Sequence, residues 1–409
     1  MSVFQNIVSR LSDLKGLMKL KEDEIKYLLE PQKISSATLK VDGKKFPAWR
    51  IISNQALGPG KGGVRFHPGV CEDEVKSLAF WMSLKNSLLG LPYGGAKGGV
   101  QFNPKEHDEI FLEKVSRAYI DSFYKVLGQD KDIPAPDVYT NSQTMAWMLD
   151  QYEKNIGEHQ AGMITGKPVE LGGITLRSDA TAKGAYFVIS ELTKTLGIED
   201  KELTVAIQGF GNAGLNIAKM MYDGNFKIVA VNDSKGGIYN QAGINITELV
   251  KFKEEYGVVS AFSDHQAISN DELLESEVDI LILGALENQI TKENAEKIKA
   301  KYIVEIANGP TSYEADKILF EKGIIVVPDI LANAGGVLVS YFEWSQNRTG
   351  NILDEEYLVK LFKNKMVQSF HNVYNKYLDF DKKIDLRTSA YIIALDKIIK
   401  AEKLRGRMR

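Results

Sequence analysis

Lys97 is the residue best placed for chemistry in this sequence. It lies in residues 91–99, LPYGGAKGG, where four glycines and an alanine leave a backbone that other groups can approach closely. A lysine amine held in this way suits a carbonyl or imine substrate, because desolvation lowers its pKa toward the range in which it transfers protons at neutral pH. The ordinary alternative is a glycine-rich turn that carries a solvated lysine.

Two other lysines occupy positions that solvation does not explain. Lys61 lies in a second segment with few side chains, GPGKGGVR at residues 58–65. Lys85 is on a helix expected from about Glu72 to Leu89, and it follows Met82 by three residues. It therefore borders an apolar stripe, where a lysine is rare unless it is paired. Snorkelling from the edge of that stripe is the alternative for Lys85. Partly buried cations need anions, and a dicarboxylate would supply two.

Asp137 is the candidate partner of Lys97 in proton transfer. It lies in DIPAPDVYTN, residues 132–141, where prolines restrict the backbone on its N-terminal side. A carboxylate held rigidly suits proton transfer, although an Asx-turn residue is the ordinary alternative. We expect burial and the neighbouring cation Lys85 to lower the pKa of Lys97.

A nucleotide site is predicted where a strand, a glycine-rich turn and a helix follow one another. Residues 203–208, LTVAIQ, lead into GFGNAG, and a helical run opens at Leu215. In such a motif Gly209 permits the tight turn, Gly211 lets a pyrophosphate approach, and Gly214 allows the helix to pack on the strand. The helix N-terminus offers free amide groups to phosphates, so the segment predicts dinucleotide binding.

Asp233 follows the second strand of this unit, about 20 residues beyond the glycines. An acid at this place binds the 2′-hydroxyl of the adenosine ribose, which favours NAD. Ser234 and Lys235 come next, and a lysine there could accept the 2′-phosphate of NADP. A plain solvated turn over residues 232–236 is the other interpretation. The choice between NAD and NADP stays open.

Helices and one hairpin are expected to hold the first group of residues. They are a helix over 2–30, a hairpin over 37–52 that turns at Asp42-Gly43, and helices over 72–89, 108–128 and 141–155. After about residue 175 short apolar strands alternate with helices, a pattern typical of a parallel sheet covered on both faces. These strands are expected at 203–207, 227–231, 278–283, 302–306 and 323–327, and residues 355–400 are helical again.

Two domains are expected, because 409 residues are too many for one comfortable core. We predict an α/β fold with an N-terminal substrate-binding and oligomerisation domain over residues 1–175. A Rossmann-type dinucleotide-binding domain follows over residues 176–379, with a cleft between the two. The C-terminal helix, about 380–409, is expected to return to the first domain.

The composition excludes several classes of protein. A formal net charge of −3 gives no field that would favour nucleic acid or an acidic membrane. The single cysteine, Cys71, excludes an internal disulfide and indicates a reducing compartment. Five scattered histidines show no metal-ligand spacing, so no metal is expected. No run reaches the roughly 20 apolar residues of a membrane helix, and the N-terminus lacks the apolar core of a signal peptide. The expected location is the cytoplasm.

The motifs together resemble the glutamate dehydrogenases of the Glu/Leu/Phe/Val amino-acid dehydrogenase family. The resemblance runs from about Trp49 to Trp344 and includes KGGVR, LPYGGAKGG, PAPD, GFGN and NAGGV, which begin at residues 61, 91, 134, 209 and 333. It implies reversible oxidative deamination of an L-amino acid with NAD or NADP. It also implies a homohexamer.

The resemblance further implies a role for each matching residue. Lys97 corresponds to the catalytic lysine, Asp137 to the aspartate that shuttles protons at the amino nitrogen, and Lys85 to the lysine that holds the α-carboxylate. Lys61 and Ser340 correspond to the pair that grips the side-chain carboxylate. The cofactor residues are Thr181 and Asn333 near the nicotinamide amide and Asn212 in the phosphate turn.

Lys61 and Ser340 favour glutamate as the substrate, with 2-oxoglutarate and ammonium as products. Relatives that act on leucine, valine or phenylalanine are expected to carry apolar residues at these two places, since a buried lysine facing an alkyl chain stays unpaired. Val337 lies three residues before Ser340 on one helical face, so a single groove could receive substrate and nicotinamide. An aliphatic or aromatic amino-acid dehydrogenase and a non-catalytic nucleotide-binding regulatory subunit are the alternatives.

Two segments depart from the family pattern. Residues 180–184 read ATAKG where Ala-Thr-Gly is common, although Thr181 is kept. Residues 283–288 read LGALEN, with glycine where proline is common. Neither departure touches the proposed proton-transfer groups.

Overall fold

The computed structural model describes residues 3–199, 203–263 and 265–408. The chain forms two compact units. Unit 1 comprises Met1–Ser178, Val337–Leu358 and Ile392–Arg409, and unit 2 comprises Asp179–Gly336 and Val359–Tyr391. Each unit therefore contains segments that are distant in the sequence.

Unit 1 combines a four-stranded sheet with helices. Its elements are α1 (Val3–Met18), α2 (Glu22–Leu29), β1 (Lys33–Val41), β2 (Lys44–Asn54), β3 (Gly60–Lys61), β4 (Val64–Phe66), α3 (Glu72–Leu88), β5 (Gly95–Val100), α4 (Glu109–Phe123), β6 (Asp132–Ile133) and α5 (Ser142–Ile156). Most of α12 (Gly335–Thr349) and the second half of α14 (Leu386–Leu404) also belong to it. The sheet order is β1-β2-β5-β4, and β3 pairs separately with β6.

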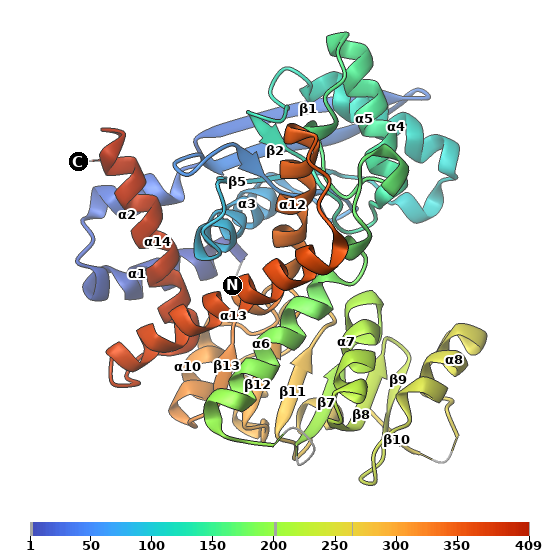
Figure 1. The fold of residues 1–409 in the computed structure, drawn as a ribbon, viewed down its shortest axis with the longest axis vertical. Helices are drawn as coiled ribbons and strands as arrows, with labels where there is room; N and C mark the ends of the chain where they lie inside the picture. Colours follow the sequence, from blue (N-terminus) through green and yellow to red (C-terminus); the bar gives the residue numbers. More distant parts are fainter. Residues whose placement is uncertain (1–2, 200–202, 264, 409) are drawn as a thin grey trace. The chain divides into compact units, whose positions relative to one another are not determined.

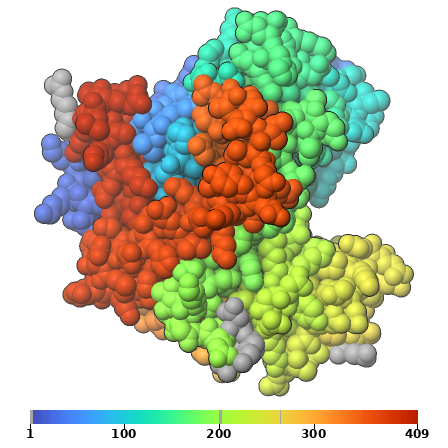
Figure 2. All heavy atoms as spheres, in the orientation of Figure 1, coloured from blue at the N-terminus to red at the C-terminus, as the bar shows by residue number. Residues whose placement is uncertain are grey.

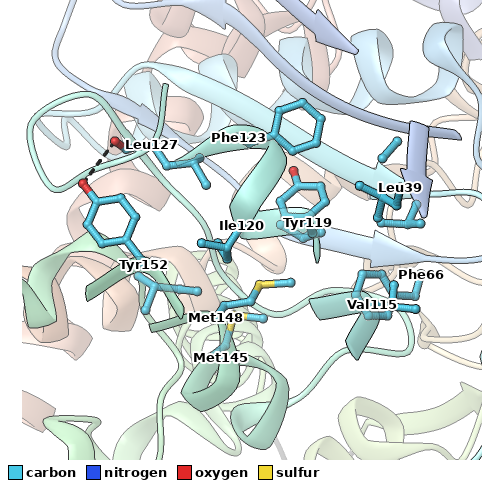
Figure 3. Close-up of a cluster of buried hydrophobic side chains, with 14 of the residues drawn as sticks. Leu39, Phe66, Val115, Tyr119, Ile120, Phe123, Leu127, Met145, Met148 and Tyr152 are labelled. Atoms are coloured by element: carbon cyan, nitrogen blue, oxygen red, sulfur yellow. Dashed lines mark hydrogen bonds between the residues drawn. The ribbon is translucent and has the colours of Figure 1, made fainter. Parts of the chain in front are cut away.

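The core of unit 1 forms where α4 and α5 pack against the sheet. Apolar side chains from both helices and from the strands interlock there, as Figure 3 shows for ten labelled residues. Val115, Tyr119 and Ile120 of α4 are fully buried in this cluster. The hydroxyl of Tyr152 donates a hydrogen bond to the Leu127 carbonyl oxygen at 3.3 Å, so even this polar atom is satisfied.

Unit 2 contains a seven-stranded sheet. Its strands are β7 (Thr204–Gln208), β8 (Lys227–Asp233), β9 (Gly236–Tyr239), β10 (Gln266–Ile268), β11 (Ile280–Leu283), β12 (Tyr302–Glu305) and β13 (Ile325–Val327). The order is β10-β9-β8-β7-β11-β12-β13 (Figure 1). Neighbouring strands are parallel in the part of the sheet ordered β8-β7-β11-β12-β13. At one edge, β9 pairs antiparallel with both β8 and β10.

Helices cover this sheet. They are α6 (Ala180–Leu196), α7 (Asn212–Asp223), α8 (Ile246–Tyr256), α9 (Asn270–Leu274), α10 (Tyr313–Glu321), α11 (Asp329–Ala332) and α13 (Glu355–Asp379). In Figure 2 the orange-red atoms of α13 lie beside the green atoms of α6. Two contacts explain this packing: Phe187 meets Phe362 edge to face, and His371 lies 2.8 Å from the Glu191 carboxylate. None of the described helices is long and apolar enough to span a membrane.

The predicted two-domain α/β fold class is confirmed, with a nucleotide-binding type of sheet in the second unit. The hairpin turns where expected, with φ of 46° at Asp42 and 77° at Gly43, values typical of a tight primed turn. The helix expected over 2–30 is wrong, because Lys19 with φ of 55° separates two helices. Residue 2 lies outside the described part.

The expected continuous second domain over 176–379 differs from the observed division. Residues 337–358 group with unit 1, although they follow directly on unit 2 in the sequence. The cause is the long helix α12, which leaves unit 2 after Gly336 and continues into unit 1. Periodicity alone cannot show which core a helix joins.

A buried charge cluster fixes the region around Asn333 in unit 2. The Arg387 guanidinium donates to the carboxylates of Glu305 at 2.6 Å, Asp316 at 2.7 Å and Asp329 at 3.2 Å. Asp329 begins α11, and its carboxylate also accepts a hydrogen bond from the Gly309 amide at 2.9 Å. The single positive charge of Arg387 therefore offsets part of the negative charge of three carboxylates that are buried together.

We expect Arg387→Ala to lower the free energy of unfolding by about 3–5 kcal/mol, because it leaves these buried carboxylates unpaired. Urea-induced unfolding followed by circular dichroism measures the loss. Arg117→Ala is the matched control, since Arg117 also pairs with two carboxylates, Glu113 and Asp150, but at the surface. The control should lose no more than about 1 kcal/mol. Equal losses in the two variants would contradict the burial argument.

Candidate active site

Lys97 lies on a strand of the unit 1 sheet. The alternative of a glycine-rich turn with a solvated lysine is wrong, since β5 pairs with β2 and β4 and the Lys97 side chain is about 5% exposed. The glycines serve close packing here. A Cβ on Gly95 would lie 2.2 Å from the Ser83 amide of α3, and a Cβ on Gly98 would lie 2.1 Å from the Tyr119 hydroxyl.

Asp137 is held beside Lys97 by the strand β4. The Val64 amide donates to the Ala135 carbonyl at 2.9 Å, and the Phe66 amide donates to the Val138 carbonyl at 3.1 Å, so the segment containing Asp137 runs along β4. The Lys97 ammonium lies 3.0 Å from Asp137 Oδ1. Charged side chains rather than an Asx turn engage this carboxylate.

Neighbouring charges decide the ionisation of this pair. Burial opposes ionisation of Asp137, but Lys97 and Arg65 outweigh it and lower the pKa of Asp137 to about 2. Burial is also the main cause that lowers the pKa of Lys97; Asp137 opposes it, while Arg65 and Arg50 add to it. The neighbouring cations that act on Lys97 are thus Arg65 and Arg50, in place of Lys85 as the sequence analysis expected.

Lys61 lies on β3, which the buried Arg50 supports. The guanidinium of Arg50 donates to both carboxylate oxygens of Asp132 and, at 3.0 Å, to the Gly62 carbonyl. A Cβ on Gly62 would lie 1.6 Å from the Ala96 carbonyl oxygen, so only glycine lets this segment press against β5. Lys61 is consequently about 1% exposed.

The helix α12 carries the other residues expected at the substrate side chain. Ser340 and Val337 are both buried on it. One turn beyond Ser340, Glu343 accepts hydrogen bonds from the Lys167 ammonium and the Gly166 amide, both at 2.7 Å. This fully buried ion pair joins α12 to the segment after α5.

Two cations near Glu343 have no anionic partner of their own. In the part of the chain that the structure describes, neither Lys61 nor Arg177 forms an ion pair. The Nε atom of Arg177 is buried without a hydrogen-bond partner. Burial, with Arg177 and Arg50 nearby, lowers the pKa of Lys61 well below its usual range, although Glu343 and Asp132 oppose this. An added carboxylate would therefore be stabilised here.

Lys85 is buried on α3, at about 9% exposure. Its side chain therefore lies largely out of solvent. Glu74 lies eleven residues earlier, three helical turns away, and hence on the same face of α3. The helix thus directs a cation and an acid toward one side.

The glycine turn of unit 2 fits a dinucleotide. Gly209 has φ of 88°, and a Cβ on Gly214 would lie 1.7 Å from the Gly209 carbonyl oxygen, so α7 packs directly on the turn. A Cβ on Gly211 would meet nothing within 4 Å, which leaves its backbone open to approach. The helix α7 begins at Asn212, and its N-terminus can receive phosphate groups.

Asp233 ends β8 and is already engaged. Its Oδ2 accepts hydrogen bonds from the Lys253 ammonium and, at 3.0 Å, from the Val259 amide, while Oδ1 accepts one from the Lys235 amide at 2.8 Å. Ser234 and Lys235 are exposed in the turn that joins β8 to β9. Lys253 offsets the negative charge of Asp233, so repulsion of a 2′-phosphate is weakened.

The remaining predicted cofactor residues also lie in unit 2. Thr181 is in the first turn of α6, so ATAKG forms an ordinary helix start. The side-chain amide of Asn333 donates to the Ala307 carbonyl at 3.1 Å. In the segment LGALEN, residues 283–288, Gly284 stands where proline is common in the family. Its amide donates to the Gln208 carbonyl at 2.8 Å, a hydrogen bond that proline could not make.

Comparison with known proteins places this geometry in one family. Residues 172–406 match the Glutamate/Leucine/Phenylalanine/Valine dehydrogenase family, and residues 31–154 match the Glu/Leu/Phe/Val dehydrogenase dimerisation domain. The chain belongs to the Glu/Leu/Phe/Val dehydrogenase family. The resemblance seen in the sequence motifs is thereby confirmed.

Individual members of the Glu/Leu/Phe/Val dehydrogenase family are similar along almost the whole chain. An NADP-specific glutamate dehydrogenase of Synechocystis sp. is 44% identical, covering 99% of this chain and 97% of its own. A catabolic NAD-specific glutamate dehydrogenase of Bacillus subtilis is 45% identical over 94% of this chain and 91% of its own. The hetero-hexameric glutamate dehydrogenase of Thermus thermophilus, in its Leu-bound form, superposes with a TM-score of 0.93 at 32% identity, covering 99% and 97%.

Several residues at this family site escaped the sequence analysis. Arg65 had a signal, since it is a cation in the same glycine-rich segment as Lys61, and Glu343 had one in its spacing from Ser340. Arg177 had none, because it ends a short 3₁₀ turn, Thr175–Arg177, outside the motifs that carry the resemblance. Lys167 and Lys253 likewise become relevant only through their partners.

We expect Gly98→Ala to lower the free energy of unfolding by about 1–3 kcal/mol through overpacking against Tyr119. Tyr119→Phe removes the interfering hydroxyl, after which the nearest Tyr119 atom to the new Cβ lies 3.2 Å away. The double variant should therefore lose less than the two single variants together. Urea titration of all three measures the coupling. Gly16→Ala, on an open helix surface, should cost nothing, and additive losses at 98 and 119 would refute the packing argument.

Proposed function

We propose that this chain is a glutamate dehydrogenase that converts L-glutamate, water and NAD⁺ or NADP⁺ reversibly to 2-oxoglutarate, ammonium, the reduced cofactor and a proton. One observation carries the choice of substrate: Lys61 is about 1% exposed and, among the described residues, has no anionic partner. A second cation, Arg177, lies close enough to lower the pKa of Lys61. The side-chain carboxylate of glutamate would pair with both.

The other substrates of the family fit this pocket less well. An alkyl or aromatic side chain would leave Lys61 and Arg177 buried without an anion, a cost of several kcal/mol. Ser340 on α12 adds a hydroxyl that can donate to a carboxylate. Comparing turnover of glutamate, leucine and phenylalanine tests the proposal. Faster turnover of leucine would overturn it, and no turnover of any of them would favour a regulatory subunit.

The side chains of unit 1 divide the chemistry among them. Lys85 holds the α-carboxylate and thereby places the amino group toward Asp137. Asp137, ionised at neutral pH, takes a proton from that amino group. Lys97, whose pKa is lowered by burial, takes a proton from the water that attacks the α-carbon. Returning those protons supports the reverse reaction.

The glycine turn of unit 2 holds NAD or NADP, which supplies the hydride acceptor when bound. Gly209, Gly211 and Gly214 shape the turn, and Asn212 begins the helix whose N-terminus would receive the pyrophosphate. Thr181 and Asn333 would contact the nicotinamide amide. The Asp233–Lys253 ion pair supports use of either cofactor. Asp233 could accept a hydrogen bond from a ribose hydroxyl, while Lys253 offsets its negative charge. Kinetics with both cofactors would measure the preference.

We also infer a hexamer in the cytoplasm. The similar enzyme of T. thermophilus is described as hetero-hexameric, and residues 31–154 match a dimerisation domain. The single cysteine is compatible with a reducing compartment.

Asp137→Asn should lower kcat by at least about 100-fold, because the amide cannot accept the proton from the substrate amino group. Binding of the reduced cofactor, followed by its fluorescence, should stay unchanged. Asp150→Asn is the control, since Asp150 also lies between two cations, Arg117 and Lys154, but at the surface. Retained turnover in Asp137→Asn would remove Asp137 from the mechanism.

Lys61→Leu combined with Ser340→Val should lower the ratio of kcat/KM for glutamate to that for norvaline by at least about tenfold. Both substitutions replace groups that pair with a carboxylate by groups that pack against an alkyl chain. Lys76→Leu, on the outer part of α3, provides a control for the loss of a lysine. An unchanged ratio in the double variant would discredit the side-chain assignment.

A further inference from the structure

Arg65 connects the proposed proton-transfer pair to the helix α3. Its Nε atom donates to Asp137 Oδ2 at 2.9 Å, and its NH1 group donates to a carboxylate oxygen of Glu74. About 14% of the Arg65 side chain is exposed, so these contacts form away from bulk water. Among the described residues, Arg65 is the hydrogen-bonding partner of the Glu74 side chain. The second carboxylate oxygen of Glu74 is buried and has no hydrogen-bond partner there.

The Asp137 carboxylate is consequently divided between two cations. Lys97 lies 3.0 Å from Oδ1, and Arg65 holds Oδ2. The Asp137 amide donates to the Thr140 hydroxyl at 2.8 Å, which fixes the backbone that carries the carboxylate. A guanidinium has a rigid, planar arrangement of donors, so Arg65 cannot follow Asp137 toward Lys97 without weakening its bond to Glu74.

We propose that Arg65, anchored by Glu74, is a positioning residue that keeps one oxygen of Asp137 away from Lys97 and so leaves the Lys97 amine available for proton transfer. This inference rests on the proposed function, which assigns proton transfer to Lys97 and Asp137. Arg65 acts in this proposal through its hydrogen bond to Asp137 and not through the substrate.

The sign of the effect follows from the charges. Burial lowers the pKa of Lys97, Asp137 opposes this, and Arg65 adds to it. Without Arg65 both oxygens of Asp137 become available to the ammonium, so the pKa of Lys97 rises. Without the charge of Glu74, Arg65 binds Asp137 more fully, so the pKa of Lys97 falls. The two changes act in opposite directions.

Other charged groups near the pair stay constant in this comparison. Arg50 on β2 acts on Lys97 and is itself paired with Asp132 of β6. Lys85 shares the α3 face with Glu74. His67, two residues after Arg65, accepts a hydrogen bond from the Gly69 amide and stacks on Tyr139.

The test is the pH profile of kcat for glutamate oxidation in Arg65→Gln, Arg65→Lys, Glu74→Gln and the wild-type enzyme. Lys97 must be deprotonated to accept a proton, so kcat rises with pH through the pKa of Lys97. We expect Arg65→Gln to move this acid limb upward by about one pH unit, which lowers kcat about tenfold on the limb. Glu74→Gln should move it downward by a few tenths of a unit. Arg65→Lys should restore most of the wild-type position.

Matched controls separate this role from a structural one. Arg117→Gln removes an arginine that also lies between two carboxylates, but on α4 and only half-buried. It should leave the acid limb of the pH profile in place. The proposal would be overturned if Arg65→Gln lowered the maximal kcat without shifting the acid limb of the pH profile. It would also be overturned if Glu74→Gln shifted that limb to higher pH. Because Glu74 is partly exposed, Glu74→Gln should fold even if Arg65→Gln does not. Absence of glutamate turnover in the wild-type enzyme would instead refute the proposed function.

Discussion

Burial of positive charge is the constraint on which unit 1 depends. Removing an ammonium or guanidinium group from water costs several kcal/mol unless an anion compensates. The structure provides such anions at Arg50, Lys97 and Lys167, which face Asp132, Asp137 and Glu343 respectively. At Lys61 and Arg177 it does not, among the described residues. We propose that a substrate carboxylate binds at these unpaired positions and compensates their charge.

Glycine makes this burial geometrically possible. A side chain on Gly62 would collide with the Ala96 carbonyl, and one on Gly95 would collide with α3. Because these positions lack side chains, β3 and α3 lie directly against β5, and their lysines are held below the surface. Ordering these glycines costs conformational entropy when the chain folds. The folded state then holds the charged side chains in a rigid arrangement. Chemistry and packing therefore depend on the same residues.

Unit 2 uses paired charges for support in the same way. Arg387 holds three carboxylates together beneath α11, the short helix that leads to Asn333. At the end of β8, Lys253 pairs with Asp233. In both units, groups proposed to contact a ligand are held by charged partners from other elements. The partner holds either the ligand-contacting side chain itself or the segment that carries it.

The sequence by itself determined the fold class, the family and the local motifs. The nucleotide turn was predictable because its strand, glycines and helix are adjacent in the chain, and Lys61, Lys97 and Asp137 stood out because glycines or prolines flank them. Only the tertiary structure decided that Lys97 lies on a strand, which begins at Gly95, and that α12 continues into unit 1. It also decided that Arg65, Arg177 and Glu343 lie near the predicted residues. Arg65 is 72 residues from Asp137, and Lys167 is 176 residues from Glu343. Periodicity and spacing report neighbours within one element, whereas the ionisation of a buried group depends on charges that folding brings from elsewhere.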